Sequence, residues 1–393
     1  MNGLKQLRES CLSKANNNVK VANEMVVKIF KEGISNKKID PKNVSIKALF
    51  EGLVDTDNLD LGNAVKVAEA IGSSAFADVL TIITSALTIE PYEIFSDDLA
   101  QLCTEGNAKF TYAETVKGMT AIGGVRRRLE TQAYGETDFE DKYIGVEKCD
   151  FGRIVSLTME DIFNDATNDI QDAANRIGED AGQHKHQMIA ETIECLPRTA
   201  FGEVTSRAFV YKGTAYTQAQ FYSTDHSAIL DFQTNCNVAT GGITQAGLTN
   251  AYNNFASLTD EKGKRIVVRP QQILVNSLNE LTLATLLATD LAVGQNFSST
   301  TGGINDVNQF GPRGKVKLAS VTSPFLATTS GLAYMGNFKK ALLWLWVQKP
   351  QTVTQGGDSN LAFERQIVWR ARFNYYGGVA LRDYRYITRI TTS

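Results

Sequence analysis

The sequence contains only three histidines, the side chains whose unperturbed pKa lies near neutral pH. Their small number limits the acid and base chemistry that the chain can perform. His226 follows Asp225 within Thr-Asp-His-Ser, which places an imidazole beside a carboxylate and two hydroxyl groups. These groups are suited to general acid and base catalysis. Adjacent residues rarely form a working dyad, however, and the sequence has no Gly-x-Ser-x-Gly turn to present a nucleophile. A soluble hydrolase that uses Asp225 and His226 is therefore the remote alternative.

Other patterns for cofactors or metals are missing from the sequence. His184 and His186 are two residues apart on an expected helix, so their side chains point about 200° apart and cannot share one metal ion. The Gly-Lys pairs at 263–264 and 314–315 lack the spacing of a phosphate-binding loop. The five cysteines are scattered, with no Cys-x-x-Cys pair. We expect no cofactor, no metal and no catalysis.

Composition is typical of an ordered protein that does not cross membranes. The 393 residues include 40 Lys and Arg and 43 Asp and Glu, for a net charge of −3, and 43% are hydrophobic. This length predicts two or three domains. A net charge near zero argues against a dedicated nucleic-acid-binding domain, although local basic patches are compatible with it. No apolar run approaches the roughly 20 residues that span a bilayer, and we expect no secretory signal and reduced thiols in a cytosolic setting.

Helical periodicity predicts short helices over residues 4–69, with breaks at 16–18 and 35–38. A long amphipathic helix is expected from Thr158 to Leu196, because apolar or small residues recur there every three or four positions. Thr158 is the expected N-cap and Pro197 the expected stop. Such a helix extends roughly 50 Å at 1.5 Å per residue. Gly178 and Gly182 weaken it, so packing must compensate.

The remaining segments predict a mixed α+β chain. Trp344 and Trp346 alternate with other apolar residues, which indicates a central strand that is buried on both faces. Residues 294–314 form a long Gly-rich loop, and loops of this length are usually functional or mobile. Strand-like residues are found at 207–211, 218–222, 265–269, 273–275, 342–348, 367–375 and 385–390, and helices are expected at 248–258 and 278–289.

A charged hairpin is predicted from Val125–Tyr134 and Tyr143–Leu157, joined by a polar tip at 135–141. It has too little apolar alternation to hold a core of its own. An extended arm over 72–115, this hairpin and the overlong helix are all explained if neighbouring copies supply the missing contacts. The alternative is a monomer in which arm and hairpin fold back on their own subunit. The candidate contact residues are Arg126, Arg127, Arg128, Glu136, Asp138, Glu140 and Asp141.

Three stretches in a specific order carry a family resemblance: Gly152–Asp165, which leads into the long helix, Phe221–Ser227, and Phe363–Arg385. From about Gly72 to the C-terminus the chain resembles the major capsid protein of tailed bacteriophages, and most closely the major head subunit of Mu-like phages. That family has the Hong Kong 97 fold, which encapsulin shells also use.

The resemblance implies an α+β Hong Kong 97-type capsid fold with an additional helical N-terminal region. In the family, the extended loop lies over an adjacent subunit and the axial domain lies at the capsomer centre. The implied parts are a helical N-terminal region (1–71), an N-terminal arm (72–118), the extended hairpin loop (119–157), a peripheral domain with the spine helix (158–247), an axial domain (248–340) and returning strands (341–393).

The implied function is assembly through hexamers and pentamers into an icosahedral shell around double-stranded DNA. The expected partners are copies of the chain, a portal, scaffolding or decoration proteins, and packaged DNA in non-specific contact. The expected location is the virion, after assembly in the host cytoplasm. The seven charged hairpin residues would pair with opposite charges on a neighbouring subunit, or else remain a solvated hairpin. The alternative function is an encapsulin-like compartment that encloses cargo.

Overall fold

Two units divide the chain in the computed structural model, and the boundaries between them fall inside two long helices and three strands. Unit 1 contains Met1–Ser96, Asp150–Gln183 and Gln348–Tyr376, and unit 2 contains Asp97–Cys149, His184–Val347 and Gly377–Ser393. The structure describes residues 2–54, 59, 63–109, 113–119, 141–158, 160–161, 169–199, 202–227, 235–260, 262–289, 308–356 and 363–392.

The N-terminal part of unit 1 is helical, as the periodicity predicts. Left-handed backbone at Asn16 (φ 50°), Asn17 (φ 61°) and Lys37 (φ 54°) produces the expected breaks. The Ser45 hydroxyl accepts the Ala48 N–H (3.3 Å) and so caps the third helix. These helices are α1 (Asn2–Lys14), α2 (Val19–Ser35), α3 (Ile46–Leu53) and α4 (Ala64–Ser73), with a 3₁₀ turn η1 (Pro41–Asn43).

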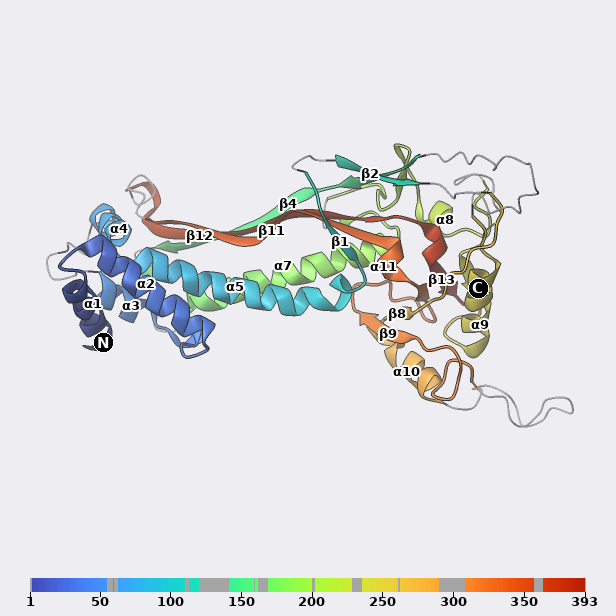
Figure 1. The fold of residues 1–393 in the computed structure, drawn as a ribbon, viewed down its shortest axis with the longest axis horizontal. Coiled ribbons are helices and arrows are strands. Elements are labelled where there is room, and N and C mark those ends of the chain that lie inside the picture. The colour runs from blue at the N-terminus through green and yellow to red at the C-terminus, as the bar shows by residue number, and fades with distance from the viewer. Residues whose placement is uncertain are drawn as a thin grey trace, which may run out of the picture. The chain divides into compact units, whose positions relative to one another are not determined.

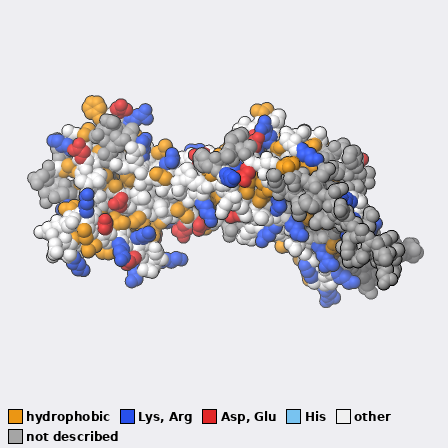
Figure 2. Space-filling model, turned by 45° about the horizontal axis from the view of Figure 1, so that its top comes forward, with side chains coloured by type: hydrophobic (Ala, Val, Ile, Leu, Met, Phe, Trp, Pro, Cys, Tyr) orange, Lys and Arg blue, Asp and Glu red, His pale blue; other side chains and the backbone are white. Residues whose placement is uncertain are grey.

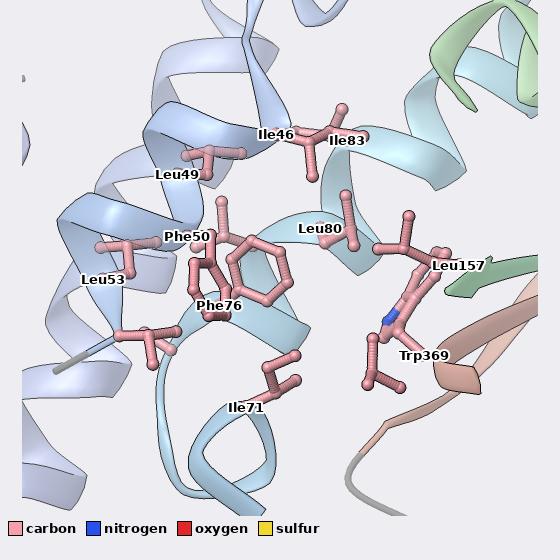
Figure 3. Close-up of a cluster of buried hydrophobic side chains, with 14 of the residues drawn as sticks. Ile46, Leu49, Phe50, Leu53, Ile71, Phe76, Leu80, Ile83, Leu157 and Trp369 are labelled. Carbon is pink, nitrogen blue, oxygen red and sulfur yellow. The ribbon is translucent and has the colours of Figure 1, made fainter. Parts of the chain in front are cut away.

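The core of unit 1 gathers apolar side chains from segments that are distant in sequence (Figure 3). Phe50 meets Phe76 edge to face with ring centroids 5.7 Å apart, an arrangement that stabilises aromatic pairs beyond simple burial. Leu157 and Trp369 extend the same cluster, and each is at most 1% exposed. Burying one such side chain contributes about 1.5–3 kcal/mol, so the N-terminal helices are integral to unit 1.

In unit 1, helix α5 (Phe76–Ala100) is fixed to strand β11 (Leu342–Gly356) by threonine pairs. The hydroxyl oxygens of Thr88 and Thr352 are 2.9 Å apart, and those of Thr81 and Thr354 are 2.8 Å apart. Strands β12 (Ile367–Leu381) and β4 (Cys149–Thr158) continue the sheet, whose order is β1-β11-β12-β4 (Figure 1). The helix continues through Pro91, where the sequence predicts an interruption, and burial of Pro91 and Tyr92 offsets the lost hydrogen bond.

Helix α7 (Asp169–Ile193) crosses α5 at Gly178, where a glycine is required by space. A Cβ atom at Gly178 would lie 2.2 Å from the carbonyl oxygen of Thr88. The glycine that weakens the helix by propensity therefore permits close contact between two helix backbones. This close approach is the packing compensation that the sequence analysis requires.

The predicted long helix has the expected cap at its start but ends before the expected Leu196. Thr158 is the last residue of β4, and its hydroxyl accepts the Asp161 N–H (3.2 Å) while the Asp161 carboxylate accepts the Thr158 N–H (2.9 Å), a reciprocal cap as predicted. At the other end, Cys195 adopts a left-handed conformation (φ 52°), and Leu196 N–H donates to the Glu191 carbonyl. The helix thus ends before Pro197. Residues 162–168 lie outside the described residues.

Unit 2 is built on a five-stranded sheet in the order β7-β13-β10-β8-β9. Its core is formed by apolar residues of these strands together with helices α9 and α10, among them Leu248, Phe255 and Leu283. The elements are β7 (Val238–Thr240), α9 (Gln245–Ser257), β8 (Gln272–Asn276), η3 (Ser277–Asn279), α10 (Glu280–Ala288), β9 (Ala319–Ser323), β10 (Ala333–Gly336), α11 (Phe338–Ala341), η4 (Tyr384–Tyr386) and β13 (Ile387–Thr391).

Several local predictions for unit 2 are confirmed and two are wrong. The helices at 248–258 and 278–289 are present, and Trp344 lies fully buried on β11, between β1 (Thr104–Asn107) and β12. Residues 218–222 form a helix, α8 (Gln218–Phe221), because Thr217 and Gln220 make a capping box. Residues 265–269 form no strand, since beyond a single bridge between Thr259 and Arg265 they have no ladder partner among the described residues.

We expect Gly178→Ala to lower the thermal midpoint of the purified protein. The added methyl must displace the Thr88 backbone, and such overpacking costs about 1–3 kcal/mol against a propensity gain of at most about 1 kcal/mol. Calorimetry measures the change. The control is Gln183→Ala, an exposed position of the same helix, which should leave the midpoint unchanged or raise it. An unchanged midpoint for Gly178→Ala would contradict the close approach.

Candidate functional site: the stem of the β2–β3 hairpin

Most of the predicted contact residues lie outside the described residues. Arg126, Arg127, Arg128, Glu136, Asp138 and Glu140 belong to this group. Asp141 is described, and it begins strand β3 (Asp141–Glu147). Its register partner is Met119, the last residue of β2 (Ala113–Met119). Segment 120–140, which carries the charged residues, is therefore connected to unit 2 through these two strands, which we call the stem.

The stem corrects the predicted strand pairing. The antiparallel partners of β3 are Ala113–Met119, which the sequence analysis assigns to the arm, and the short strand β5 (Val210–Tyr211), rather than Val125–Tyr134. The predicted strand Tyr143–Leu157 is also two strands, β3 and β4, with a break at Lys148. Val125–Tyr134 itself, predicted as a strand from its composition, lies outside the described residues. The described pairing is determined instead by Val116 and Val146, which pack in a small cluster against Leu343 and Leu345.

A buried lysine fixes the point where β3 ends. The Lys148 side chain is fully buried, and its ammonium lies 2.8 Å from the Glu114 carboxylate on β2. The same ammonium donates to the Lys109 carbonyl (2.9 Å). A buried charge is tolerated only when it is paired and hydrogen-bonded, so this arrangement holds both strands in place.

A buried arginine secures the same end of the stem from the other side. Arg198 is fully buried and forms an ion pair with Glu203, while its guanidinium also donates to the Val379 carbonyl (2.8 Å). Glu147, the last residue of β3, lies 3.9 Å from Arg198 and also pairs with Arg207. Arg207 is half exposed, so its contribution is small compared with that of the buried arginine.

Close backbone packing adds to these ion pairs. We call the set of contacts made by Lys148, Glu114, Arg198, Glu203 and Glu147 the anchor of the stem. A Cβ atom at Gly378 on β12 would lie 2.0 Å from the Glu147 carbonyl oxygen, so the strand end has no room to shift. Burial raises the pKa of the neighbouring Cys149 thiol, an effect that Arg198 opposes. The thiol therefore stays neutral at physiological pH, and the charges of the anchor are the Lys, Arg and Glu side chains alone.

The anchor residues were not identified from the sequence. Glu114, Lys148, Arg198 and Glu203 come from separate segments and occupy no recognisable motif. Only the lack of a core in the predicted hairpin hinted that something else must hold it. A pair such as Lys148 and Glu114 becomes visible only when the strand register is known.

The hydrolase alternative depends on Asp225 and His226, which the structure does not bring together as a dyad. His226 is fully buried, its Nδ1 lies 2.7 Å from the Asn235 carbonyl oxygen and its Nε2 2.9 Å from that of Phe221. Both ring nitrogens therefore face backbone carbonyl oxygens inside the fold, and neither faces the Asp225 carboxylate or a nucleophile. The ring also stacks on Tyr384 with centroids 3.8 Å apart.

Asp225 acts locally instead. It is exposed, and a hydrogen bond from the Ser227 N–H (2.9 Å) lowers the pKa of its carboxyl group. His186, the other buried histidine, lies 2.9 Å from the Ser323 hydroxyl and packs against Phe325. Within the described part of the chain no group of three His, Cys, Asp or Glu side chains is arranged to hold a metal ion.

Apolar surface is exposed at the start of α10. Leu278 and Leu281, three residues apart on η3 and α10, are 72% and 80% exposed. Neighbouring exposed leucines of this kind are typical of surfaces that contact another protein.

In the described residues no single helix is long and apolar enough to cross a membrane, whereas α4 and Phe76–Phe95, bent by 80°, meet that test only as a pair.

We expect Glu114→Gln to destabilise the stem by about 3–5 kcal/mol, nearer the lower value because Glu114 keeps some contact with water. The change deprives the buried Lys148 charge of its carboxylate partner. Proteolysis within the stem, followed by mass spectrometry, measures the effect. The double variant Glu114→Gln with Lys148→Met should be more resistant than Glu114→Gln alone, because it removes the uncompensated charge. Equal sensitivity of the two variants would show that the pair does not hold the stem.

We expect His226→Ala to lower stability by about 1–3 kcal/mol, because the buried Asn235 carbonyl loses its contact with the ring, whereas the Phe221 carbonyl keeps the Asn237 amide as a donor. Asp225→Asn should change stability little, because its carboxylate is exposed. Thermal unfolding of both variants checks this difference. A hydrolase would instead lose a measurable ester- or peptide-cleaving activity in both variants at unchanged stability.

Comparisons with known proteins agree with the resemblance seen in the sequence. A sequence model of a family described as phage capsid protein matches residues 146–390. No curated protein sequence matches the chain. The capsid of a native GTA particle is 11% identical, over 75% of this chain and 89% of that chain, with a TM-score of 0.47. A structure from Microbacterium phage Oxtober96 is 12% identical, over 75% of this chain and 90% of that chain, with a TM-score of 0.44. The cyanophage Pam1 capsid is also 12% identical, over 71% of this chain and 84% of that chain, with a TM-score of 0.44.

Proposed function

Because the chain belongs to the phage capsid protein family, we propose that it is the major capsid protein of a tailed phage, which assembles into an icosahedral shell around double-stranded DNA. The observation that carries this proposal is the family match over residues 146–390, which includes α7, most of unit 2 and the returning strands. The mixed α+β fold with long strands β11 and β12 is compatible with it. The matched family consists of phage capsid proteins, which favours a phage shell over an encapsulin-like compartment.

The stem gives this proposal a physical basis. Lys148 and Arg198 hold the start of β2 and the end of β3, so the two strands that flank segment 120–140 have a fixed base. We propose that its arginines and carboxylates pair with opposite charges on a neighbouring copy. Each exposed pair contributes only about 0–1 kcal/mol, so the contacts must be repeated many times around the shell. Exposed apolar residues such as Leu278 and Leu281 supply surface of the kind that contacts between copies bury.

The parts implied by the resemblance belong to the same proposal. Residues 72–118 would act as the arm, 119–157 as the extended loop, 158–247 as the peripheral domain and 248–340 as the axial domain at the centre of hexamers and pentamers. A portal and scaffolding or decoration proteins are the proposed further partners, and the host cytoplasm is the proposed place of assembly. No step of this function requires catalysis.

Electron microscopy with light scattering tests the proposal. The protein should form closed shells, tubes or separate hexamers when it is expressed alone or together with a neighbouring scaffold gene. Monomers or dimers under both conditions would contradict it. Co-purified nucleic acid separates a phage shell from a cargo compartment, which should instead contain a co-purified enzyme.

Charge reversal tests the role of the segment that the stem carries. We expect Arg126→Glu, Arg127→Glu and Arg128→Glu together to reduce shell yield or shell stability, because attractive pairs with the neighbour become repulsive. The control reverses Lys20, Lys31 and Lys38, three exposed lysines on or just after helix α2, which gives the same change in net charge. Equal shell yield and thermal stability for the arginine variant and the unmodified protein would defeat the idea.

A further inference from the structure

Two segments of unit 2 concentrate positive charge on a chain whose net charge is negative. Residues 260–269 and 313–317 together contain seven Lys and Arg and two acidic residues, whereas the whole chain carries a net charge of −3. We call their cationic side chains the basic surface: Lys262, Lys264, Arg265, Arg269, Arg313, Lys315 and Lys317. All seven are exposed.

Alternation along both segments turns the cations outward. Ile266 and Val268 pack against the unit 2 core, while Arg265 and Arg269 on either side of them are exposed. In the second segment Val316 and Leu318 pack inward in the same way. The apolar residues therefore fix each segment to unit 2 and orient its Lys and Arg side chains toward solvent.

The sheet places the two segments at one edge. They lead into β8 and β9, which are parallel neighbours with Gln272 opposite Ala319. The Ala319 N–H donates to the Gln271 carbonyl (2.9 Å), so the pairing continues toward the basic residues. Parallel strands present their starting ends at the same edge, about 4.8 Å apart, so Arg269 and Lys317 belong to one surface.

A tight turn presents the lysines of the first segment. The buried Asp260 carboxylate accepts the backbone N–H groups of Lys262 (3.0 Å) and Lys264 (2.7 Å), and Gly263 adopts the positive φ of 75° that the turn needs. The carboxylate thus fixes the backbone of the turn. Glu261 lies outside the described residues.

The composition of this surface favours a polyanion over a protein partner. The central parts of protein interfaces are depleted in charged residues, and in lysine above all, whereas this surface consists mainly of Lys and Arg. Among the described residues, no carboxylate lies within ion-pair distance of Lys264, Arg265, Arg269 or Lys315. Lys and Arg side chains also gather at the lower right of Figure 2, with few acidic ones among them.

We propose that the basic surface binds the phosphate backbone of the packaged double-stranded DNA without reading its sequence. This inference rests on the proposed function, which supplies the DNA. Neutralisation of phosphates releases counterions, so the contact depends steeply on salt. No aromatic side chain or amide belongs to the surface, which leaves it without groups that distinguish bases.

The experiment compares two full-length variants with equal charge changes. The first replaces Lys264, Arg265, Arg269 and Lys315 with Gln, and the control replaces the exposed Lys14, Lys20, Lys31 and Lys38 with Gln. Fluorescence anisotropy measures binding of a mixed-sequence DNA duplex by unassembled protein over a series of salt concentrations. The first variant should lose about tenfold or more in affinity, and its plot of log affinity against log salt should be shallower by about 3–4. The control should resemble the unmodified protein.

Two results would overturn the inference: an unchanged salt slope for the first variant, or an equal loss in the control, which would show a general charge effect. Electron microscopy of the same samples separates this inference from the proposed function. Shells that form normally but show no change in DNA binding contradict only the DNA-binding surface. A first variant that binds DNA normally but no longer assembles identifies the surface as a contact between copies. Absence of shells for all three proteins contradicts the proposed function, whatever the binding data show.

Discussion

Burial of two cations, Lys148 and Arg198, is the constraint on which the stem depends. Each has lost its contact with water, and that loss is compensated only because a carboxylate and a backbone carbonyl lie within reach. Such pairs add little net stability compared with apolar residues of the same size, but removing one partner is costly. Their main effect is on specificity, since alternative positions of β2 or β3 would leave a charge buried without a partner. The register from Ala113–Glu147 to Met119–Asp141 is therefore the one that satisfies them.

Unit 1 is stabilised in a different way, by close apolar packing and neutral hydrogen bonds. Gly178 lets α7 approach α5 at the Thr88 carbonyl, and the threonine pairs with Thr352 and Thr354 then fix α5 to β11. The N-terminal helices join the same core through Phe50 and Phe76. These helices lie outside the region matched by the family, which begins at residue 146. Their burial nevertheless makes them part of the folded unit.

The sequence predicted what depends on neighbouring residues and missed what depends on distant ones. Periodicity identified α2, α9 and α10, and the Thr158 cap is confirmed because a reciprocal cap needs only four residues. The strand prediction for residues 218–222 was wrong because a capping box favours a helix there despite the strand-like composition. The predicted partner of β3 was wrong because the prediction used only the strand-like residue types of Val125–Tyr134. Pairing depends instead on contacts between distant residues, such as that of Lys148 with Glu114. No local pattern marks a buried ion pair between residues 34 positions apart.

Charged residues therefore have two distinct uses in this chain. Buried and paired, as at Lys148 and Arg198, they determine where a strand ends, and they depend little on salt. Exposed cations such as Arg269 and Lys315 contribute little to the fold and remain available to a partner, with a strength that falls as salt rises. The proposed shell would use both kinds, because its subunits would hold one shape while their contacts with each other and with DNA stay weak enough to form reversibly. Weak contacts repeated over many identical copies would correct errors during assembly, whereas a fixed stem would let each copy present them in the same place.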